Sequence, residues 1–285
     1  MRTIILAFAL CLPGLAGADT IRIASWNIEH LVAEEMRGCR PRTEGEFQRV
    51  RDVIEEVGAD IWLLQEVESE AALHRIFDPN EHVFHVETRS PRASYPECRN
   101  MPGERLAMQA TAVVVRDGIA HERLPDLDAL DIGGQGRLRH GVTIRLAGEQ
   151  PLNILNVHLR SGCFEGVGRQ ACGDVFAQLP VLRAWLDEQD GPALLGGDIN
   201  RRLEVEGDVF WTLLNEYDDL HIAGAGIRPQ CFARFTEFID FLILDDATIT
   251  AKRLGSFAET TFSGPEEDFP SDHCPVSIEL DLGRL

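Results

Sequence analysis

A series of short runs that are apolar, or alternate between apolar and polar residues, recurs along the chain and predicts a core built from β-strands. Amphipathic segments at Glu44–Val57 and Val175–Gln189 lie between some of these runs and predict outer helices. The mixture is neither a strict alternation of strands and helices nor strands alone, so we expect packed sheets with helices outside. The predicted strands are Thr20–Trp26, Asp60–Gln65, His82–Val86, Gln109–Val115, Gly141–Leu146, Leu152–His158, Ala193–Gly197, Phe238–Leu244 and Val276–Leu280.

The charge of the chain restricts its partners. The 285 residues contain 27 Lys and Arg against 47 Asp and Glu, a formal net charge of -20. Such a chain does not coat nucleic acid or anionic membrane through its overall field, although a local basic cleft is still allowed. All basic residues except Lys252 are Arg, the better bidentate ligand of phosphate, but codon usage in a GC-rich genome would give the same bias.

The first residues have the form of a secretory signal peptide. Met1 and Arg2 precede an apolar run from Thr3 to Leu12, and Ala16-Gly17-Ala18 is a small-x-small cleavage site. The run of about ten residues is too short to cross a bilayer of roughly 30 Å, and no later segment is longer. We therefore expect residues 1–18 to be removed, and residues 19–285 to form one exported domain, periplasmic or extracellular, without a membrane span.

Cysteine usage agrees with export. Cys11 leaves with the signal peptide, and an even set of six remains, which in an oxidising compartment predicts three disulfides. We expect Cys163–Cys172 first, because both lie in one short Gly-rich loop, and Cys39–Cys98 and Cys231–Cys274 from their positions in the proposed fold. Zinc is the alternative, but no C-x-x-C or close Cys/His spacing is present.

Four connections exceed the usual loop length, and such loops tend to be functional. They are Arg89–Arg105, Pro125–Arg139, Ser161–Gly173 and Ala223–Thr236.

Polar residues of matching chemistry stand at the ends of several predicted strands. At a sheet edge each side chain would be held rigidly, as a pre-organised site requires. For any one of them a helix cap or turn role is an alternative, but the set as a whole predicts a site. The residues are Asn27, Glu66, His158, Asp198, Asn200, Asp272 and His273.

Six motifs place these residues in an order that resembles the endonuclease/exonuclease/phosphatase superfamily, the deoxyribonuclease I-like proteins. They are Ser25-Trp26-Asn27-Ile28, Leu64-Gln65-Glu66-Val67, Asn156-Val157-His158-Leu159, Gly196-Gly197-Asp198-Ile199-Asn200, Ile239-Asp240-Phe241 with Ile243, and Ser271-Asp272-His273-Cys274-Pro275. The resemblance implies an α/β fold, a four-layered sandwich of two packed mixed β-sheets flanked by helices. It places the site at one end of the sheets.

The resemblance also implies a metal site and a hydrolytic centre. Glu66 would bind the metal, and Asn27 and Asp272 would complete or flank the site. Oxygen ligands favour Mg²⁺, with Mn²⁺ or Ca²⁺ as alternatives. Asp198 would orient the attacking water, and Asn200 would donate to a phosphoryl oxygen.

Two histidines would transfer protons, each oriented by a carboxylate. We expect His273, paired with Asp240, as general base, and His158, paired with Glu87, as general acid, the reverse remaining open. The other histidines, His30 among them, are expected to be structural or on the surface.

Three arginines beside the motifs are candidates for phosphate binding, with a solvated surface position as the alternative for each. They are Arg139, Arg160 and Arg201.

The function implied is an exported, metal-dependent phosphodiesterase acting on nucleic acid, a DNase-like endonuclease without sequence specificity. We expect a monomer without an obligate protein partner. The alternatives are a phospholipid phosphodiesterase of the sphingomyelinase kind or another small phosphoester hydrolase, and a non-catalytic binding module of the same fold. An aromatic-rich exposed hairpin would favour the lipid, but all four Trp residues lie in predicted strand or helix contexts. Intact motif residues disfavour the binding module.

Overall fold

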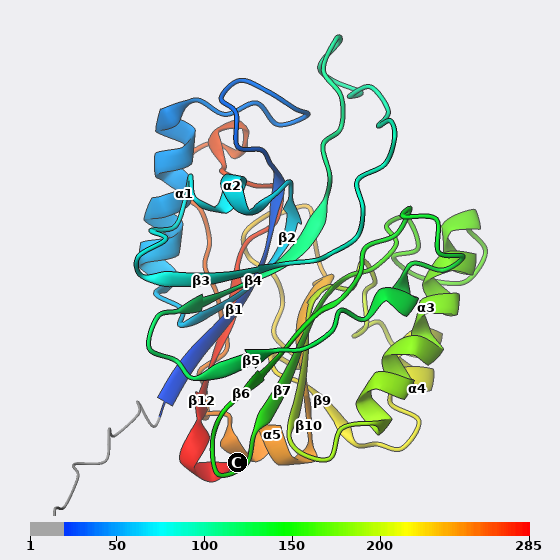
Figure 1. Cartoon of the computed structure of the whole chain (residues 1–285). Helices are drawn as coiled ribbons and strands as arrows, with labels where there is room; N and C mark the ends of the chain where they lie inside the picture. The colour runs from blue at the N-terminus through cyan, green and yellow to red at the C-terminus, as the bar shows by residue number, and fades with distance from the viewer. Residues whose placement is uncertain (1–19) are drawn as a thin grey trace, which may run out of the picture.

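Two six-stranded mixed β-sheets pack face to face in the computed structural model, which describes residues 20–285 (Figure 1). The first sheet has the order β11-β12-β1-β2-β4-β3 and the second the order β5-β6-β7-β8-β10-β9. One parallel pair lies inside each sheet, β1 with β2 and β7 with β8, and the other pairs are antiparallel. The first sheet comprises β1 (Thr20–Leu31), β2 (Ile61–Val67), β3 (His82–Val86), β4 (Ala110–Arg116), β11 (Ala258–Glu259) and β12 (Val276–Asp281). The second comprises β5 (His121–Arg123), β6 (Val142–Leu146), β7 (Leu152–His158), β8 (Ala193–Asp198), β9 (Leu220–Ile222) and β10 (Asp240–Asp245).

Helices cover the outer faces and complete the four layers. A capping box between Thr43 and Glu46 starts α1 (Glu44–Val57), whose buried stripe packs under the first sheet against Trp26 and Trp62. On the opposite side α3 (Gln170–Asp187) packs its buried residues on the second sheet (Figure 1). Shorter helices are α2 (Glu70–Leu73), α4 (Val209–Leu214) and α5 (Asp246–Ala251), with 3₁₀ turns η1 (Asp128–Leu130), η2 (Glu266–Asp268) and η3 (Leu282–Arg284). The predicted fold class is confirmed.

Alternate residues of the central strands enter two different cores. In β1, Ile23 points between the sheets, whereas Ala24 and Trp26 lie in the cluster under α1. Both faces of these strands are therefore buried, which explains their nearly continuous apolar sequence.

Two glycines allow β8 to approach its neighbours closely. A Cβ on Gly196 would lie 2.4 Å from Leu63 Cδ1 of the facing sheet. One on Gly197, which has a φ of +133°, would lie 2.0 Å from the Val157 carbonyl oxygen. A side chain at Gly197 would meet the backbone of β7 within its own sheet, and one at Gly196 would displace Leu63 of the facing sheet, so both glycines allow close packing directly before Asp198.

Most sequence expectations for the elements are confirmed. Every predicted strand is present, and all three expected disulfides are formed, Cys39–Cys98, Cys163–Cys172 and Cys231–Cys274. α3 begins at Gln170 rather than at Val175, and β1 continues to Leu31. The predicted signal peptide, residues 1–18 with Cys11, lies outside the described residues. Within residues 20–285 no helix has the length and apolar composition needed to cross a membrane.

Candidate active site

Residues in or next to strands of both sheets surround a cavity of about 350 Å³ at one edge of the sandwich. All seven strand-end residues singled out in the sequence line this cavity together with Asp240, although they come from distant parts of the chain. They are Asn27, Glu66, His158, Asp198, Asn200, Asp240, Asp272 and His273.

Irregular backbone aims two of these side chains into the cavity. The pairing of β2 shifts register between Leu64 and Val67, and Glu66 within that bulge has a φ of 63°. Asn200, two residues after Asp198, has a φ of 55°. Positive φ values outside glycine are sparsely populated and gather at functional sites, where bulges re-aim side chains.

A buried amide pair joins the two sheets behind the cavity. Gln65 Nε2 donates to Asn156 Oδ1 at 2.8 Å, and Asn156 Nδ2 donates to the carbonyl oxygens of Leu64 and Ala112 at 2.9 and 2.8 Å. These hydrogen bonds fix the position of β2 relative to β7, directly before Glu66 on β2 and His158 on β7. Both belong to motifs of the sequence, but the sequence alone assigned neither of them a role.

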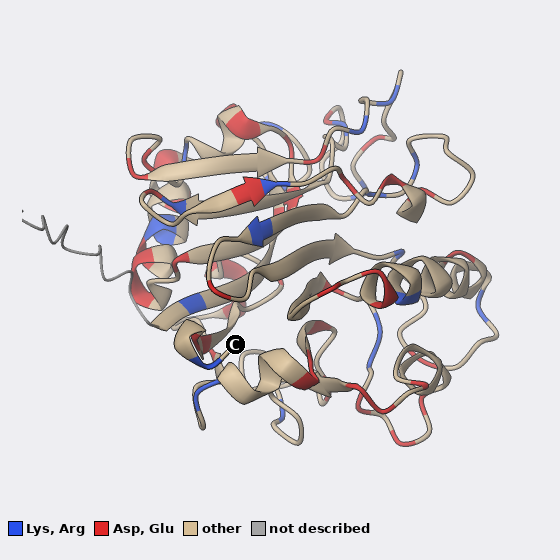
Figure 2. Cartoon of the chain, turned by 60° about the horizontal axis from the view of Figure 1, so that its bottom comes forward, with Lys and Arg blue, Asp and Glu red and all other residues tan. Residues whose placement is uncertain are grey.

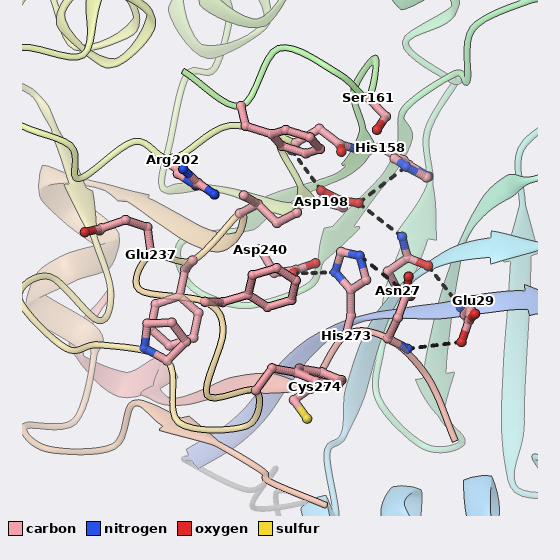
Figure 3. Close-up of a pocket in the computed structure, with 18 of the residues that line it drawn as sticks. Asn27, Glu29, His158, Ser161, Asp198, Arg202, Glu237, Asp240, His273 and Cys274 are labelled. Atoms are coloured by element: carbon pink, nitrogen blue, oxygen red, sulfur yellow. Dashed lines mark hydrogen bonds and ion pairs between the residues drawn. The ribbon is translucent and has the colours of Figure 1, made fainter. Parts of the chain in front are cut away.

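His273 forms the expected pair with Asp240 (Figure 3). Its Nδ1 lies 2.7 Å from Asp240 Oδ2, its carbonyl accepts from Trp26 Nε1, and its backbone N–H donates to Ser271 Oγ. Burial alone would lower the pKa of His273, but the Asp240 carboxylate raises it well above the ordinary value. The charged imidazolium is therefore the favoured form.

Asp198 lies at the centre of the cavity and connects its two sides (Figure 3). Its carboxylate accepts from Asn27 Nδ2 at 3.1 Å and from the Asn200 backbone N–H at 2.8 Å, and His158 Nε2 lies 3.4 Å away. Burial and the neighbouring Asp240 raise the pKa of Asp198 to about 7.

His158 is buried, but the carboxylate expected to orient it lies elsewhere. Glu87 accepts from Arg89 Nη2 at 2.9 Å and from the His140 backbone N–H at 2.6 Å, while His158 Nδ1 has no partner among the described residues. The predicted pairing with Glu87 is wrong, because this carboxylate anchors the chain before β6, and the contact of His158 is Asp198. Burial and then the Arg139 charge lower the pKa of His158 well below its ordinary value, so the neutral imidazole is favoured.

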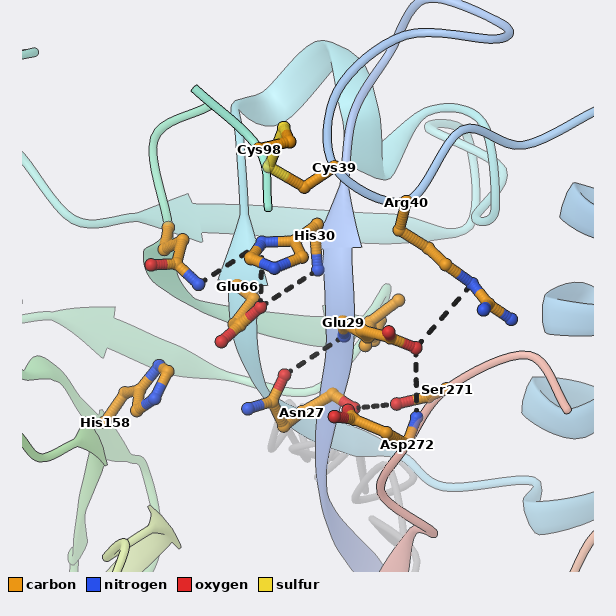
Figure 4. Close-up of polar contacts among 12 residues, drawn as sticks. Asn27, Glu29, His30, Cys39, Arg40, Glu66, Cys98, His158, Ser271 and Asp272 are labelled. Atoms are coloured by element: carbon orange, nitrogen blue, oxygen red, sulfur yellow. Dashed lines mark hydrogen bonds and ion pairs between the residues drawn. A yellow bond between two sulfur atoms is a disulfide. The ribbon is translucent and has the colours of Figure 1, made fainter. Parts of the chain in front are cut away.

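Glu66 is suited to binding a cation. Burial would raise its pKa, but His30 and Arg139 outweigh this and lower it, so the group is a carboxylate. Its Oε2 accepts from the His30 backbone N–H at 3.1 Å, and the same oxygen lies 3.1 Å from His30 Nδ1 (Figure 4). Oxygen donors of Asn27 and Asp272 line the same cavity, although Asp272 is largely exposed. An all-oxygen donor set fits a hard cation such as Mg²⁺.

A second group with metal-ligand spacing consists of Asp198, Asp240 and His273, whose ligand atoms lie within 4.8 Å of one another. His273 Nδ1 is already paired with Asp240 there. This group is therefore better suited to proton transfer than to holding a metal.

Sequence reasoning missed His30 and Glu29, which directly follow the first motif. Asn27 Oδ1 accepts from the Glu29 backbone N–H, and Glu29 Oε2 accepts from that of Asp272 (Figure 4). Both residues have positive φ. The signal was a polar pair, Glu29-His30, between two apolar residues, Ile28 and Leu31, directly after the first motif.

The three predicted phosphate-binding arginines differ in position. Arg139 is close enough to Glu66 to affect its pKa, and its Nη2 donates to Gln109 Oε1 at 3.1 Å. Neither Arg139 nor Arg160 is among the residues that line the cavity, and Arg160 Nε lies 3.7 Å from Asp174.

The prediction for Arg201 is wrong. This side chain is fully buried, paired with Asp208 at 2.6 Å, and donates to the carbonyls of Cys163 and Gly166. It holds the Ser161–Gly173 loop in place and cannot reach a phosphate.

Phenylalanines form the other wall of the cavity, a feature that the sequence search for exposed tryptophans missed. Arg234 lies over the rings of Phe232 and Phe235, 4.5 and 4.7 Å from their centroids. The Cys231–Cys274 disulfide ties this loop to the residue after His273. The ring residues are Phe164, Phe232, Phe235 and Phe238.

Known structures share this architecture at low sequence identity. Truncated TDP2 from Caenorhabditis elegans superposes with a TM-score of 0.60 at 17% identity, covering 92% of this chain and 97% of that one. The human nocturnin catalytic domain with bound sulfate superposes with a TM-score of 0.59 at 14% identity, and the alignment covers 91% of this chain and 92% of that one. The AP endonuclease of Leishmania major superposes with a TM-score of 0.56 at 13% identity, and the alignment covers 92% of this chain and 87% of that one.

Sequence comparison assigns the chain more directly than these structural similarities. A search of curated proteins finds no match. The profile of the Endonuclease/Exonuclease/phosphatase family, in contrast, matches residues 24–273, nearly the whole described chain. The chain therefore belongs to the endonuclease/exonuclease/phosphatase family.

Proposed function

We propose that this protein is an exported, metal-dependent phosphodiesterase that cleaves nucleic acid as a non-specific endonuclease. The observation that carries the proposal is the single cavity that joins the Glu66 carboxylate, His158, Asp198 and the Asp240–His273 pair. Hydrolysis of a phosphodiester needs a cation site, an oriented water, and groups that accept and donate protons, and this cavity offers residues for each.

Glu66 would hold the cation, with Asn27 and Asp272 beside it. When bound, Mg²⁺ would neutralise charge on the phosphoryl oxygens. Arg139, next to Glu66, would add positive charge on the same side, and Asn200 would donate to a phosphoryl oxygen without adding negative charge.

His158 and His273 would carry the two proton transfers around Asp198, which orients the attacking water. The opposite pKa directions support neutral His158 as the acceptor of the water's proton and charged His273 as the donor to the leaving oxygen. This is the reverse of the roles that we expected from the sequence. The water oxygen then bonds to phosphorus as the P–O bond to the leaving group breaks.

Nucleic acid is the favoured substrate because two rings of the phenylalanine wall, Phe164 and Phe235, are accessible to a base beside the reacting phosphate. One of the similar structures is an AP endonuclease, which agrees with this substrate class. The same apolar wall favours a second candidate, a phospholipid or small aromatic phosphoester.

Export is supported by the three disulfides, which persist in oxidising compartments. With the predicted signal peptide removed, residues 19–285 would act as a single catalytic domain and as a monomer.

A substrate panel tests this function. Purified protein is assayed on supercoiled plasmid, single-stranded DNA, RNA, sphingomyelin and bis-p-nitrophenyl phosphate, each with Mg²⁺ or EDTA. We expect Mg²⁺-dependent nicking of plasmid that EDTA abolishes. Intact nucleic acid together with hydrolysis of the lipid or small ester would move the substrate to the second candidate.

A further inference from the structure

A second groove, of about 840 Å³, opens beside the catalytic cavity and shares Glu29, His30 and Asp272 with it. One wall is the long connection between β3 and β4, which stands out at the top of Figure 1. The Cys39–Cys98 disulfide lines the groove and ties this connection to the segment after β1 (Figure 4). The groove is therefore a fixed extension of the site.

The groove is strongly basic in a chain whose net charge is -20. Only three acidic residues line it, Glu29, Glu97 and Asp272, against twice that number of arginines. Figure 2 shows basic segments along the loops that project beyond the strand ends. The arginines of the groove are Arg89, Arg92, Arg99, Arg137, Arg139 and Arg160.

Several of these arginines are available to a ligand. Within residues 20–285, Arg92, Arg99 and Arg139 have no carboxylate within 4.0 Å, although most other arginines of the chain are paired. Arg137 and Arg160 share one carboxylate, that of Asp174. Positive charge left without an acidic partner inside a concave surface attracts polyanions and focuses their approach.

Arg139 connects the groove to the chemistry. It lines the groove while its charge acts on both Glu66 and His158. Tyr95 also lines the groove and adds a ring on which a base can stack. A chain of phosphates that lies along these arginines would thus arrive with one phosphate beside Glu66.

We infer that this groove, which we term the arginine groove, binds the phosphates of a nucleic acid strand on one side of the scissile bond. The inference rests on the proposed function and makes an extended strand the substrate, rather than a single phosphoester or a lipid headgroup. Charge complementarity selects a polyanion, and a concave, disulfide-tied groove beside the catalytic cavity suits a strand better than a membrane surface.

The test compares Arg92→Ala/Arg99→Ala with the wild-type protein on two substrates, a dinucleotide and an oligonucleotide of about 20 nucleotides. We expect KM for the oligonucleotide to rise about tenfold and the slope of log KM against log salt to decrease by about two, because two phosphate contacts are lost. The change should be confined to the long substrate, with kcat conserved. Arg49→Ala/Arg253→Ala is the matched control, because both arginines are exposed and outside either cavity.

The outcomes separate this inference from the proposed function. Cleavage of both substrates by the wild-type protein, with KM and salt slope unchanged in the double variant, would overturn the inference and leave the function in place. Failure of the wild-type protein to cleave either substrate with Mg²⁺ would overturn the function itself. If the double variant instead loses binding to anionic phospholipid vesicles while its oligonucleotide KM is unchanged, the groove is a lipid site and the inference is wrong.

Discussion

His158 is a buried imidazole and His273 a partly buried one in the same cavity, and their surroundings move their pKa values in opposite directions. His273 has a carboxylate at 2.7 Å, whereas His158 is buried with Arg139 as its main charged influence. Two titratable groups whose pKa values are shifted in opposite directions can start the reaction in different protonation states. The motifs of the sequence located both histidines, but the role of each depends on neighbours that are distant in the chain.

The residual activity of His158→Ala distinguishes the two role assignments. Loss of a proton-transfer group should reduce kcat by about 10²- to 10⁴-fold. If His273 is the donor, the remaining rate should fall as the pH rises through its raised pKa, because the donor loses its proton. A remaining rate that rises over the same pH range would assign His273 as the base and contradict our proposal.

The side-chain partners of the site explain which residue predictions failed. Arg201 directly follows the motif that ends at Asn200, and Glu87 directly follows the predicted strand His82–Val86, and the chemistry of both suits a site. Their charges are satisfied instead by Arg89 and Asp208, which position loops. A sequence shows which charged residues are near a motif, but it does not show which of them the fold pairs with one another.

At the scale of elements, the central strands could be predicted because both their faces are buried and their sequences are continuously apolar. The short strands β5, β9 and β11 carry no such pattern, since they pair at or near the sheet edges over only two or three residues. The bulge that aims Glu66 was equally hidden, because it depends on the register between β2 and β4.

Gly197 in β8 provides a test of how closely these elements must pack. A Cβ there would meet the Val157 carbonyl at 2.0 Å with φ at +133°, so we expect Gly197→Ala to destabilise the fold by about 3 kcal/mol. Gly168→Ala is the control, because its added Cβ meets nothing within 4 Å, and its change should stay within about 0.5 kcal/mol. Urea unfolding measures the free energy of unfolding of both variants. Equal values for Gly197→Ala and Gly168→Ala would show that the close approach of β8 and β7 is not required.

At the scale of the whole molecule, the proposed catalytic centre lies between two surfaces of different character. The phenylalanine wall borders it on one side and the arginine groove on the other, and Glu29, His30 and Asp272 line both cavities. A strand could therefore place a base on one side and its phosphates on the other. The net charge of -20 opposes binding elsewhere on the surface, so affinity should depend steeply on salt.

The central claim is that a cation held at Glu66 enables this cavity to cleave a phosphodiester. The most direct measurement is Mg²⁺-dependent nicking of supercoiled plasmid by Glu66→Gln, with Glu55→Gln on the exposed face of α1 as the matched control. Binding of Mg²⁺ to each protein is followed by calorimetry in parallel. We expect Glu66→Gln to lose both Mg²⁺ binding and nicking while Glu55→Gln and the wild-type protein keep both. Nicking by Glu66→Gln at the wild-type rate, or wild-type nicking that EDTA leaves unchanged, would contradict the account.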